Sequence, residues 1–205
     1  EGSLHGAAGA VEAHIHELAD QHLIGKDPAG PEAHWHKLYH GWRWRGGATA
    51  MTAMAAIDLA LWDLEGKRLG VPVHRLLGGA LRTRLKAYAS HWLSGVRSPE
   101  AALAGAKEAR RRGFKAFKFV PVTHEGLRDD EASEIALARD LMAAAREGAG
   151  ADAEIFLECA EFLSPRTAVL LEEALRPYRP GWMEEPIPFE NPAAMVALQQ
   201  QLKTP

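Results

Sequence analysis

The second half of the sequence alternates between short apolar runs and longer segments with helical spacing. The apolar runs cover residues 83–90, 114–120, 153–159 and 181–186. The segments typical of helices cover residues 98–113, 129–147, 164–178 and 191–202. Strands that alternate with helices in this way predict βα units and a parallel sheet. The pattern therefore assigns the chain to the α/β class.

The first part of the chain has a different pattern, with helices predicted over residues 7–24, 32–39 and 48–70. The segment 48–70 is rich in Ala, Leu and Met, contains no proline and ends at Gly70, as helices often do. It is apolar nearly all round, so we expect it to be buried on several sides. We divide the chain into residues 1–80 and residues 81–205.

Composition excludes several classes of protein. The 205 residues are 47% apolar and 25% charged, which is normal for a globular protein. The net charge of −3 gives no electrostatic basis for binding nucleic acid. No apolar run reaches the roughly 18 residues of a membrane span. The single cysteine, Cys159, excludes an internal disulfide and is typical of a reducing compartment, so we expect a cytoplasmic location.

Charged residues stand where the predicted strands end. Parallel βα folds bind ligands at the carboxyl ends of their strands. Lys118 lies near the end of the second strand, Glu158 near the end of the third, and Glu184 with Glu185 at the end of the fourth. Such carboxylates form an oxygen-ligand set suited to Mg²⁺, and the lysine could act as a base or polarise a substrate carboxylate. The alternative for the adjacent glutamates is a solvated loop or a helix cap.

Two other candidates are interpreted structurally. His36 and His40 have the i,i+4 spacing of helical metal ligands but lack a third ligand, so we interpret them as solvated helix positions. Cys159 follows Glu158 and should point to the other side of the strand. We interpret it as a small core residue rather than a nucleophile.

A resemblance to a known family extends along essentially the whole chain. Its most specific segment is AMAAIDLALWDLEGKRLGVPVHRLLGG, residues 53–79. The other segments are LIGKDP (23–28), RGG (45–47), GFKAFK (113–118) and LRPYRPGWMEEPIPFEN (175–191). In this order they resemble the mandelate racemase and muconate lactonizing enzyme branch of the enolase superfamily. Within that branch the chain most resembles the acid-sugar dehydratases of the galactonate type.

The resemblance implies an α+β capping domain over a modified (β/α)8 barrel. Three carboxylates, at the ends of the third, fourth and fifth strands, would hold Mg²⁺. A base would remove the proton α to a sugar carboxylate, giving an enediolate, and the β-hydroxyl would then be lost. The chain would contain the helical part of the cap and the first four βα units. We expect an incomplete barrel that is inactive alone, either a fragment of a longer protein or a chain that needs a partner.

The resemblance also implies roles for four residues. Glu158 and Glu184 match the third-strand and fourth-strand metal ligands. Lys118 matches the first lysine of the family's second-strand Lys-x-Lys motif and is the candidate catalytic residue. Arg45 lies in the cap loop that borders the active site and is the candidate substrate-binding residue. The implied partners are a small-molecule sugar acid and further copies of the same chain.

Three positions depart from the family pattern. The third-strand ligand is usually aspartate, whereas here it is Glu158. Val120 replaces the second lysine, and Ala160 replaces a histidine that often supplies the acid in these dehydratases. These departures leave two alternatives open: a racemase or epimerase of the same superfamily, and a homologue that has lost catalysis.

Overall fold

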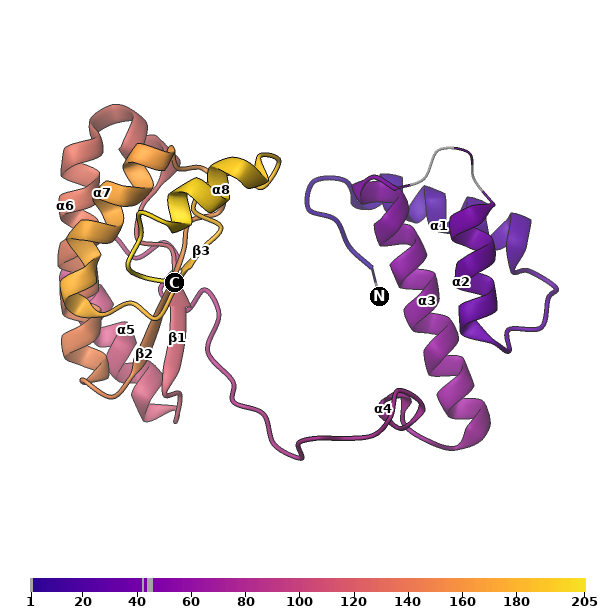
Figure 1. The fold of residues 1–205 in the computed structure, drawn as a ribbon. Helices are drawn as coiled ribbons and strands as arrows, with labels where there is room; N and C mark the ends of the chain where they lie inside the picture. The colour runs from indigo at the N-terminus through magenta and orange to yellow at the C-terminus, as the bar shows by residue number, and fades with distance from the viewer. Residues whose placement is uncertain (1, 42, 44–45) are drawn as a thin grey trace. The chain divides into compact units, whose positions relative to one another are not determined.

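The computed structural model describes residues 2–41, 43 and 46–205. The chain divides into two compact units, residues 1–84 and 85–205 (Figure 1). The division lies close to the boundary predicted between residues 80 and 81.

The first unit is helical. It contains α1 (Ala8–His22), α2 (Pro31–His40), α3 (Ala48–Leu69) and the short α4 (Val73–Leu76). Helices α1 and α2 pack against α3 around one apolar cluster of Val11, Leu18, Leu38, Ala53, Met54, Ile57 and Leu61. Helix α3 ends as predicted, because Gly70 adopts a left-handed φ of 69° that residues with a Cβ rarely adopt.

The expectation that α3 is buried on several sides is wrong for the described part of the chain. Ala53, Met54, Ile57 and Leu61 belong to the cluster shared with α1 and α2, whereas Leu59, outside that cluster, is 57% exposed. An apolar composition shows that a helix can be buried all round, but burial requires neighbours on each side. Within this unit, α1 and α2 cover only one stripe of α3.

The second unit is built from βα units. Its elements are α5 (Pro99–Arg111), β1 (Ala116–Phe119), α6 (His124–Ala149), β2 (Glu154–Glu158), α7 (Pro165–Leu175), the turn η1 (Arg176–Tyr178), β3 (Met183–Glu184) and α8 (Pro192–Gln199). The strands form a parallel sheet in the order β1-β2-β3. Helices α5, α6 and α7 lie on one side of the sheet (Figure 1). The α/β class and the incomplete barrel are confirmed.

The sheet has fewer and shorter strands than predicted. In place of a strand over 83–90, the described residues contain a single parallel bridge between Ala89 and Phe117. Leu85, near the start of this segment, is 82% exposed, whereas Tyr88, just before the bridge, packs against Phe156 and Trp182. The strand predicted over 181–186 is reduced to Met183–Glu184. The description as four βα units is therefore corrected to three strands and one bridge.

The helix starts follow from capping side chains. Ser98, Thr123, Ser164 and Asn191 each accept a backbone N–H of the helix that follows them. Proline occupies the first turn of α5, α7 and α8, where a missing N–H costs nothing. Helix α6 starts at His124 rather than at the predicted residue 129, and it is kinked at the non-helical Asp130.

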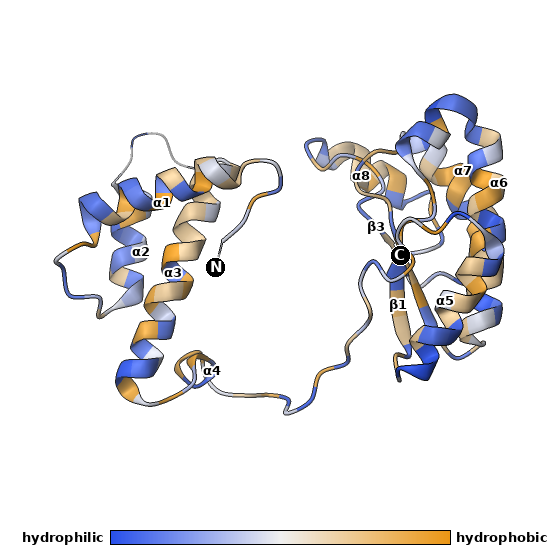
Figure 2. Ribbon diagram, turned by 180° about the vertical axis from the view of Figure 1, so that it is seen from behind, coloured by the Kyte–Doolittle hydropathy of each residue, from blue (hydrophilic) through white to orange (hydrophobic). Residues whose placement is uncertain are grey.

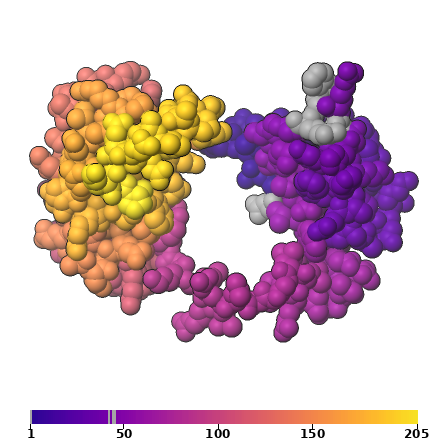
Figure 3. Space-filling view, viewed as in Figure 1, coloured from indigo at the N-terminus to yellow at the C-terminus, as the bar shows by residue number. Residues whose placement is uncertain are grey.

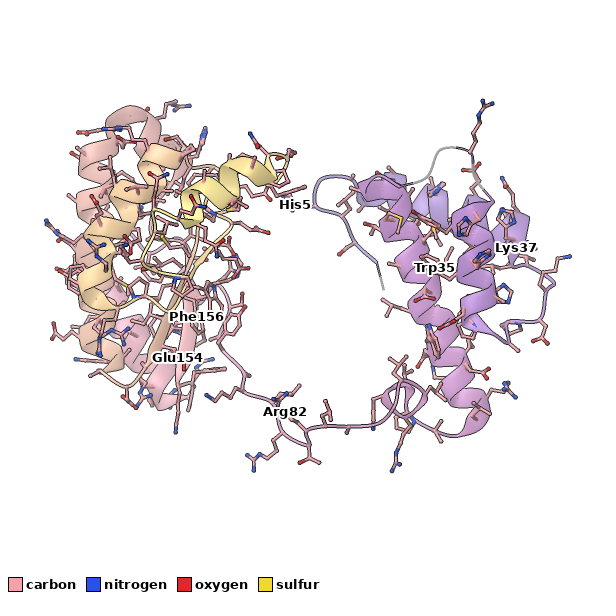
Figure 4. All side chains as sticks on the ribbon, in the orientation of Figure 1. His5, Trp35, Lys37, Arg82, Glu154 and Phe156 are labelled. Carbon is pink, nitrogen blue, oxygen red and sulfur yellow. The ribbon has the colours of Figure 1, made fainter. Side chains whose placement is uncertain are left out.

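The two faces of the sheet have different characters. Phe117, Phe119, Ile155, Leu157 and Met183 belong to the apolar core that the sheet forms with the helices. Apolar residues run along β1 and α7 (Figure 2). Because side chains alternate along a strand, Lys118, Phe156 and Glu158 point to the opposite face. Figure 4 labels two residues of β2, Glu154 at its start and Phe156 in its middle. In the space-filling view, α8 and the residues after it lie over the orange part of this unit (Figure 3).

A buried carboxylate anchors the loop between β1 and α6. Glu134, 5% exposed, pairs with Arg97 and accepts the backbone N–H of Thr123 at 2.6 Å and its hydroxyl at 3.1 Å. Burial raises the pKa of Glu134, but the Arg97 and Thr123 hydrogen bonds outweigh it and leave the pKa below its ordinary value. A lowered pKa means that the stabilisation is present at neutral pH and is lost as the pH falls through the folded-state pKa.

We expect Glu134→Gln to lower the free energy of unfolding by about 1–2 kcal/mol at neutral pH. The difference from the wild type should shrink in acid, where the carboxylate becomes protonated in both states. Urea unfolding at several pH values measures both effects. The control is Glu147→Gln, an exposed carboxylate on the same helix. Equal losses for the two variants, or a loss at Glu134 that grows in acid, would contradict the prediction.

Candidate functional site

Three charged side chains meet at the carboxyl ends of the strands. The ammonium Nζ of Lys118, on β1, lies 2.7 Å from Oε2 of Glu158 on β2 and 2.8 Å from Oε1 of Glu184 on β3. Parallel pairing sets Glu158 directly beside Glu184, so the two carboxylates leave the same edge of the sheet. The structure therefore brings together three of the four residues singled out in the sequence.

Burial makes this cluster electrostatically significant. Lys118 and Glu158 are only 4% and 6% exposed, whereas the side chain of Glu184 is 35% exposed. Charges this deep in a protein need partners, and here one cation is shared by two anions. The three groups carry a net charge of −1. Glu184 is the most exposed of the three.

The pKa of Lys118 reflects this pairing. Burial by itself lowers the pKa of the amine, because it disfavours the charged form. The hydrogen bonds and charges of Glu158 and Glu184 act in the opposite direction and outweigh burial, so the pKa is raised above its ordinary value. In this arrangement Lys118 is a protonated ammonium at neutral pH and cannot accept a proton.

Each carboxylate is also held at its second oxygen by an uncharged donor. The backbone N–H of Ala160 donates to Oε1 of Glu158 at 3.0 Å. The indole N–H of Trp182 donates to Oε2 of Glu184 at 3.1 Å. Sequence reasoning missed both donors. Trp182 could have been proposed from the sequence, because side chains two positions apart on a strand point to the same face of the sheet.

An aromatic layer lies next to the charged cluster on the same face of the sheet. The rings of Phe156 and Trp182 are stacked, with centroids 3.5 Å apart and planes at 6°. The ring of Tyr88 meets both edge-on, at 5.3 and 5.6 Å. The side chains of Lys118, Glu158 and Glu184 therefore emerge beside a packed apolar layer, which limits their freedom to turn away.

The backbone is strained just beyond the strand ends. Ala160, Glu161 and Glu185 have φ values of 49°, 65° and 47°, a region that residues with a Cβ rarely adopt. The N–H of Glu161 donates to the carbonyl of Glu185 at 2.7 Å, which ties the two turns together. Strained residues of this kind tend to collect at functional sites, where the surrounding structure compensates for their cost.

The remaining predicted residues have different outcomes. Arg45 lies outside the described residues, so its role stays a prediction. Val120 is half-buried and Ala160 is exposed, and neither brings a titratable side chain to the cluster. Cys159 is fully buried in the core shared with the helices, which confirms its interpretation as a core residue.

Burial raises the pKa of the Cys159 thiol to about 12, with the negative charges of Glu158 and Glu184 adding to the shift. We expect the folded chain to resist alkylation by iodoacetamide at about pH 8, because only the thiolate reacts. Labelling followed by mass spectrometry, with and without urea, checks this. Labelling of the folded chain as fast as that of the unfolded chain would contradict it.

Two oxygens of the cluster are of the kind that a hard cation binds. Glu158 Oε2 and Glu184 Oε1 both face a single positive charge, and carboxylate oxygens are the donors that Mg²⁺ prefers. The described residues supply two such ligands rather than a complete set. Across residues 2–41, 43 and 46–205, no group of three or more His, Cys, Asp or Glu side chains is placed to hold a metal ion. In the same ranges, every helix is too short or too polar to cross a membrane.

Comparison with known proteins matches both parts of the chain. Residues 1–78 match the mandelate racemase/muconate lactonizing enzyme N-terminal domain. Residues 101–205 match the enolase C-terminal domain-like family. The D-galactonate dehydratases of Cronobacter sakazakii and Ralstonia nicotianae are 39% and 40% identical to the chain. Each match covers 98% of this chain but 52% of the relative, so the chain spans about half the length of these proteins.

Solved structures show the same likeness. An enolase superfamily member from Salmonella Typhimurium has a TM-score of 0.91 at 29% identity, over 99% of this chain and 57% of its own. The 3,6-anhydro-D-galactonate cycloisomerase of Zobellia galactanivorans has a TM-score of 0.82 at 26% identity, over 100% of this chain and 54% of its own. The chain therefore belongs to the mandelate racemase and muconate lactonizing enzyme family of the enolase superfamily.

Proposed function

We propose that this chain carries part of the active site of a Mg²⁺-dependent acid-sugar dehydratase. The observation that supports this most directly is the cluster of Lys118, Glu158 and Glu184 at the carboxyl ends of neighbouring parallel strands. That edge is where parallel βα folds bind their ligands. The D-galactonate dehydratases aligned over nearly the whole chain support the choice of reaction.

Glu158 and Glu184 would hold the metal through the oxygens that now face Lys118. When bound, the cation supplies positive charge that stabilises a substrate carboxylate as its α proton is removed. Glu158 is one methylene longer than the aspartate usual in the family. Its fixed second oxygen, bonded to Ala160 N–H, offsets part of the added freedom. The third carboxylate ligand implied by the family is not assigned to any described residue.

Lys118 would act as a positive charge rather than as the proton acceptor. Its ammonium is bonded to both carboxylates, so its natural role in this arrangement is to attract a negatively charged group. With the metal on the two glutamates, the ammonium would be released towards the substrate carboxylate. The base that removes the α proton is not assigned to Lys118.

The substrate class and the assembly are part of the same proposal. A sugar acid brings the carboxylate that both a cation and an ammonium would bind. Arg45 remains the substrate-binding residue predicted from the sequence. Assembly into homo-oligomers and a cytoplasmic location remain predictions from the sequence.

Metal binding and turnover test the proposal separately. We expect Glu158→Gln and Glu184→Gln to weaken Mg²⁺ binding to the chain by about 10-fold or more, measured by isothermal titration calorimetry. The matched control is Glu154→Gln, an exposed carboxylate at the other end of the same strand, which should bind as the wild type does. The complete gene product, screened with Mg²⁺ against a panel of acid sugars, should form a 2-keto-3-deoxy acid.

The outcomes distinguish the alternatives. Mg²⁺ binding that is unaffected by either substitution would exclude the metal centre. Metal binding without turnover of any acid sugar would favour a homologue that has lost catalysis, as the side chains at Val120 and Ala160 also suggest. Exchange of the α proton with solvent deuterium without loss of water would favour a racemase or epimerase.

A further inference from the structure

We propose that Trp182 is a positioning residue that sets the direction of the Glu184 carboxylate at the metal centre. The inference rests on the proposed function only in calling Glu184 a metal ligand. Its geometric content, that the indole orients the carboxylate, stands on contacts within this chain.

The hydrogen bond from Trp182 fixes one oxygen of Glu184 and leaves the other available. The indole N–H donates to Oε2 at 3.1 Å, while Oε1 lies 2.8 Å from the ammonium of Lys118. A carboxylate held at both oxygens has a fixed plane as well as a fixed position. Without the indole N–H, Glu184 could rotate about its last side-chain torsion, which is broad in free carboxylates.

The indole can impose this direction because it is itself immobilised. It is stacked on Phe156, with ring centroids 3.5 Å apart, and it meets the ring of Tyr88 edge-on at 5.6 Å. The preceding residue is a glycine for a steric reason. A Cβ at Gly181 would lie 2.6 Å from a ring carbon of Phe156, so the stack needs a residue without one. Phe156 on β2 and Tyr88 in the segment before α5 therefore hold the donor in place.

Glu158 is held in the same way by a different donor. Its Oε1 accepts the backbone N–H of Ala160 at 3.0 Å, and its Oε2 faces Lys118. Each carboxylate thus has one oxygen tied to a neutral group and the other directed at the same point. Outer donors of this kind orient ligands in advance and raise metal affinity. The backbone provides the donor on β2, whereas on β3 the donor is the side chain of Trp182.

The first test removes the N–H and keeps the ring. We expect Trp182→Phe to weaken Mn²⁺ binding to the chain by about 10-fold, measured from the electron paramagnetic resonance signal of free Mn²⁺. The matched control is Trp92→Phe, which removes an indole hydrogen bond of 2.8 Å to the carbonyl of Gly105. That control should change the Kd by less than about twofold. Equal affinities for Trp182→Phe and the wild type would overturn the proposal.

A second readout does not depend on metal. In a crystal structure of Trp182→Phe, the Glu184 carboxylate should be rotated, with Oε1 no longer on Lys118. A carboxylate that keeps its wild-type direction would overturn the positioning role. If the wild type and Glu184→Gln bind Mn²⁺ equally poorly, the metal centre fails, while the crystal structure still decides the role of Trp182.

If Trp182→Phe does not fold, an isosteric residue preserves the test. Trp182→β-(3-benzothienyl)alanine replaces the N–H with sulfur and retains the shape of the ring system. It should retain the stack with Phe156 and weaken Mn²⁺ binding as Trp182→Phe does. Wild-type affinity in this variant would also overturn the proposal.

Discussion

Replacing Lys118 with methionine should lower the free energy of unfolding of the metal-free chain by about 3–5 kcal/mol. The ammonium neutralises Glu158, whose side chain is 8% exposed, and also contacts Glu184. Methionine leaves a buried carboxylate without its cation and places two negative charges side by side. Breaking a buried pair by removing one partner is among the most costly single changes a protein can undergo.

Urea unfolding followed by circular dichroism measures this loss. The control is Lys115→Met, because Lys115 is an exposed lysine directly before the same strand. We expect the control to change stability by less than about 0.5 kcal/mol. A small loss at Lys118, comparable to that of the control, would mean that the two carboxylates do not depend on the ammonium.

The same variant reports whether the ammonium and a metal compete for one place. If both use Glu158 Oε2 and Glu184 Oε1, Lys118→Met should bind Mg²⁺ more tightly than the wild type. Added Mg²⁺ should then restore more stability to the variant, since a ligand stabilises by RT ln(1 + [L]/Kd). Weaker binding in the variant would show instead that the ammonium assists the cation.

Replacing Arg146 with methionine should lower the free energy of unfolding by about 3–4 kcal/mol. Arg146, on α6, donates only to backbone carbonyls: those of Tyr178 at 3.0 Å, Gly150 at 3.2 Å, Ala153 at 2.6 Å and Arg179 at 3.0 Å. These carbonyls belong to the loops that lead into β2 and β3. Methionine would leave several of them without a partner in a partly buried environment.

Thermal and urea unfolding measure the effect, and Arg139→Met provides the control. Arg139 is on the same helix but bonds only its neighbour Asp140, and both side chains are about half exposed. We expect the control to lose less than about 0.5 kcal/mol. Similar losses for the two arginines would show that the loops before β2 and β3 do not depend on Arg146.

Local chemistry explains which elements the sequence could predict. Helices α5 and α7 begin where Ser-Pro pairs indicate, and Gly70 ends α3, because caps and left-handed glycines act within a few residues. The predicted strand over 83–90 failed for the opposite reason. Its alternation needs a core to face, and Leu85 is 82% exposed. The extent to which α3 is buried could not be predicted for the same reason, because burial depends on the elements that pack beside a helix.

The same distinction between local and long-range interactions applies to the candidate site. The sequence by itself determined that Lys118, Glu158 and Glu184 stand at strand ends, because a strand end is a local property and parallel strands end at one edge. Only the tertiary structure decided that the ammonium lies between the two carboxylates and that Trp182 and Ala160 hold their outer oxygens. Those contacts depend on the parallel register and on side-chain packing. The ammonium contacts join residues far apart in the chain, so no local pattern encodes them. Trp182 and Ala160 are each two positions from the carboxylate they hold, but side-chain packing and backbone conformation decide that they donate to it.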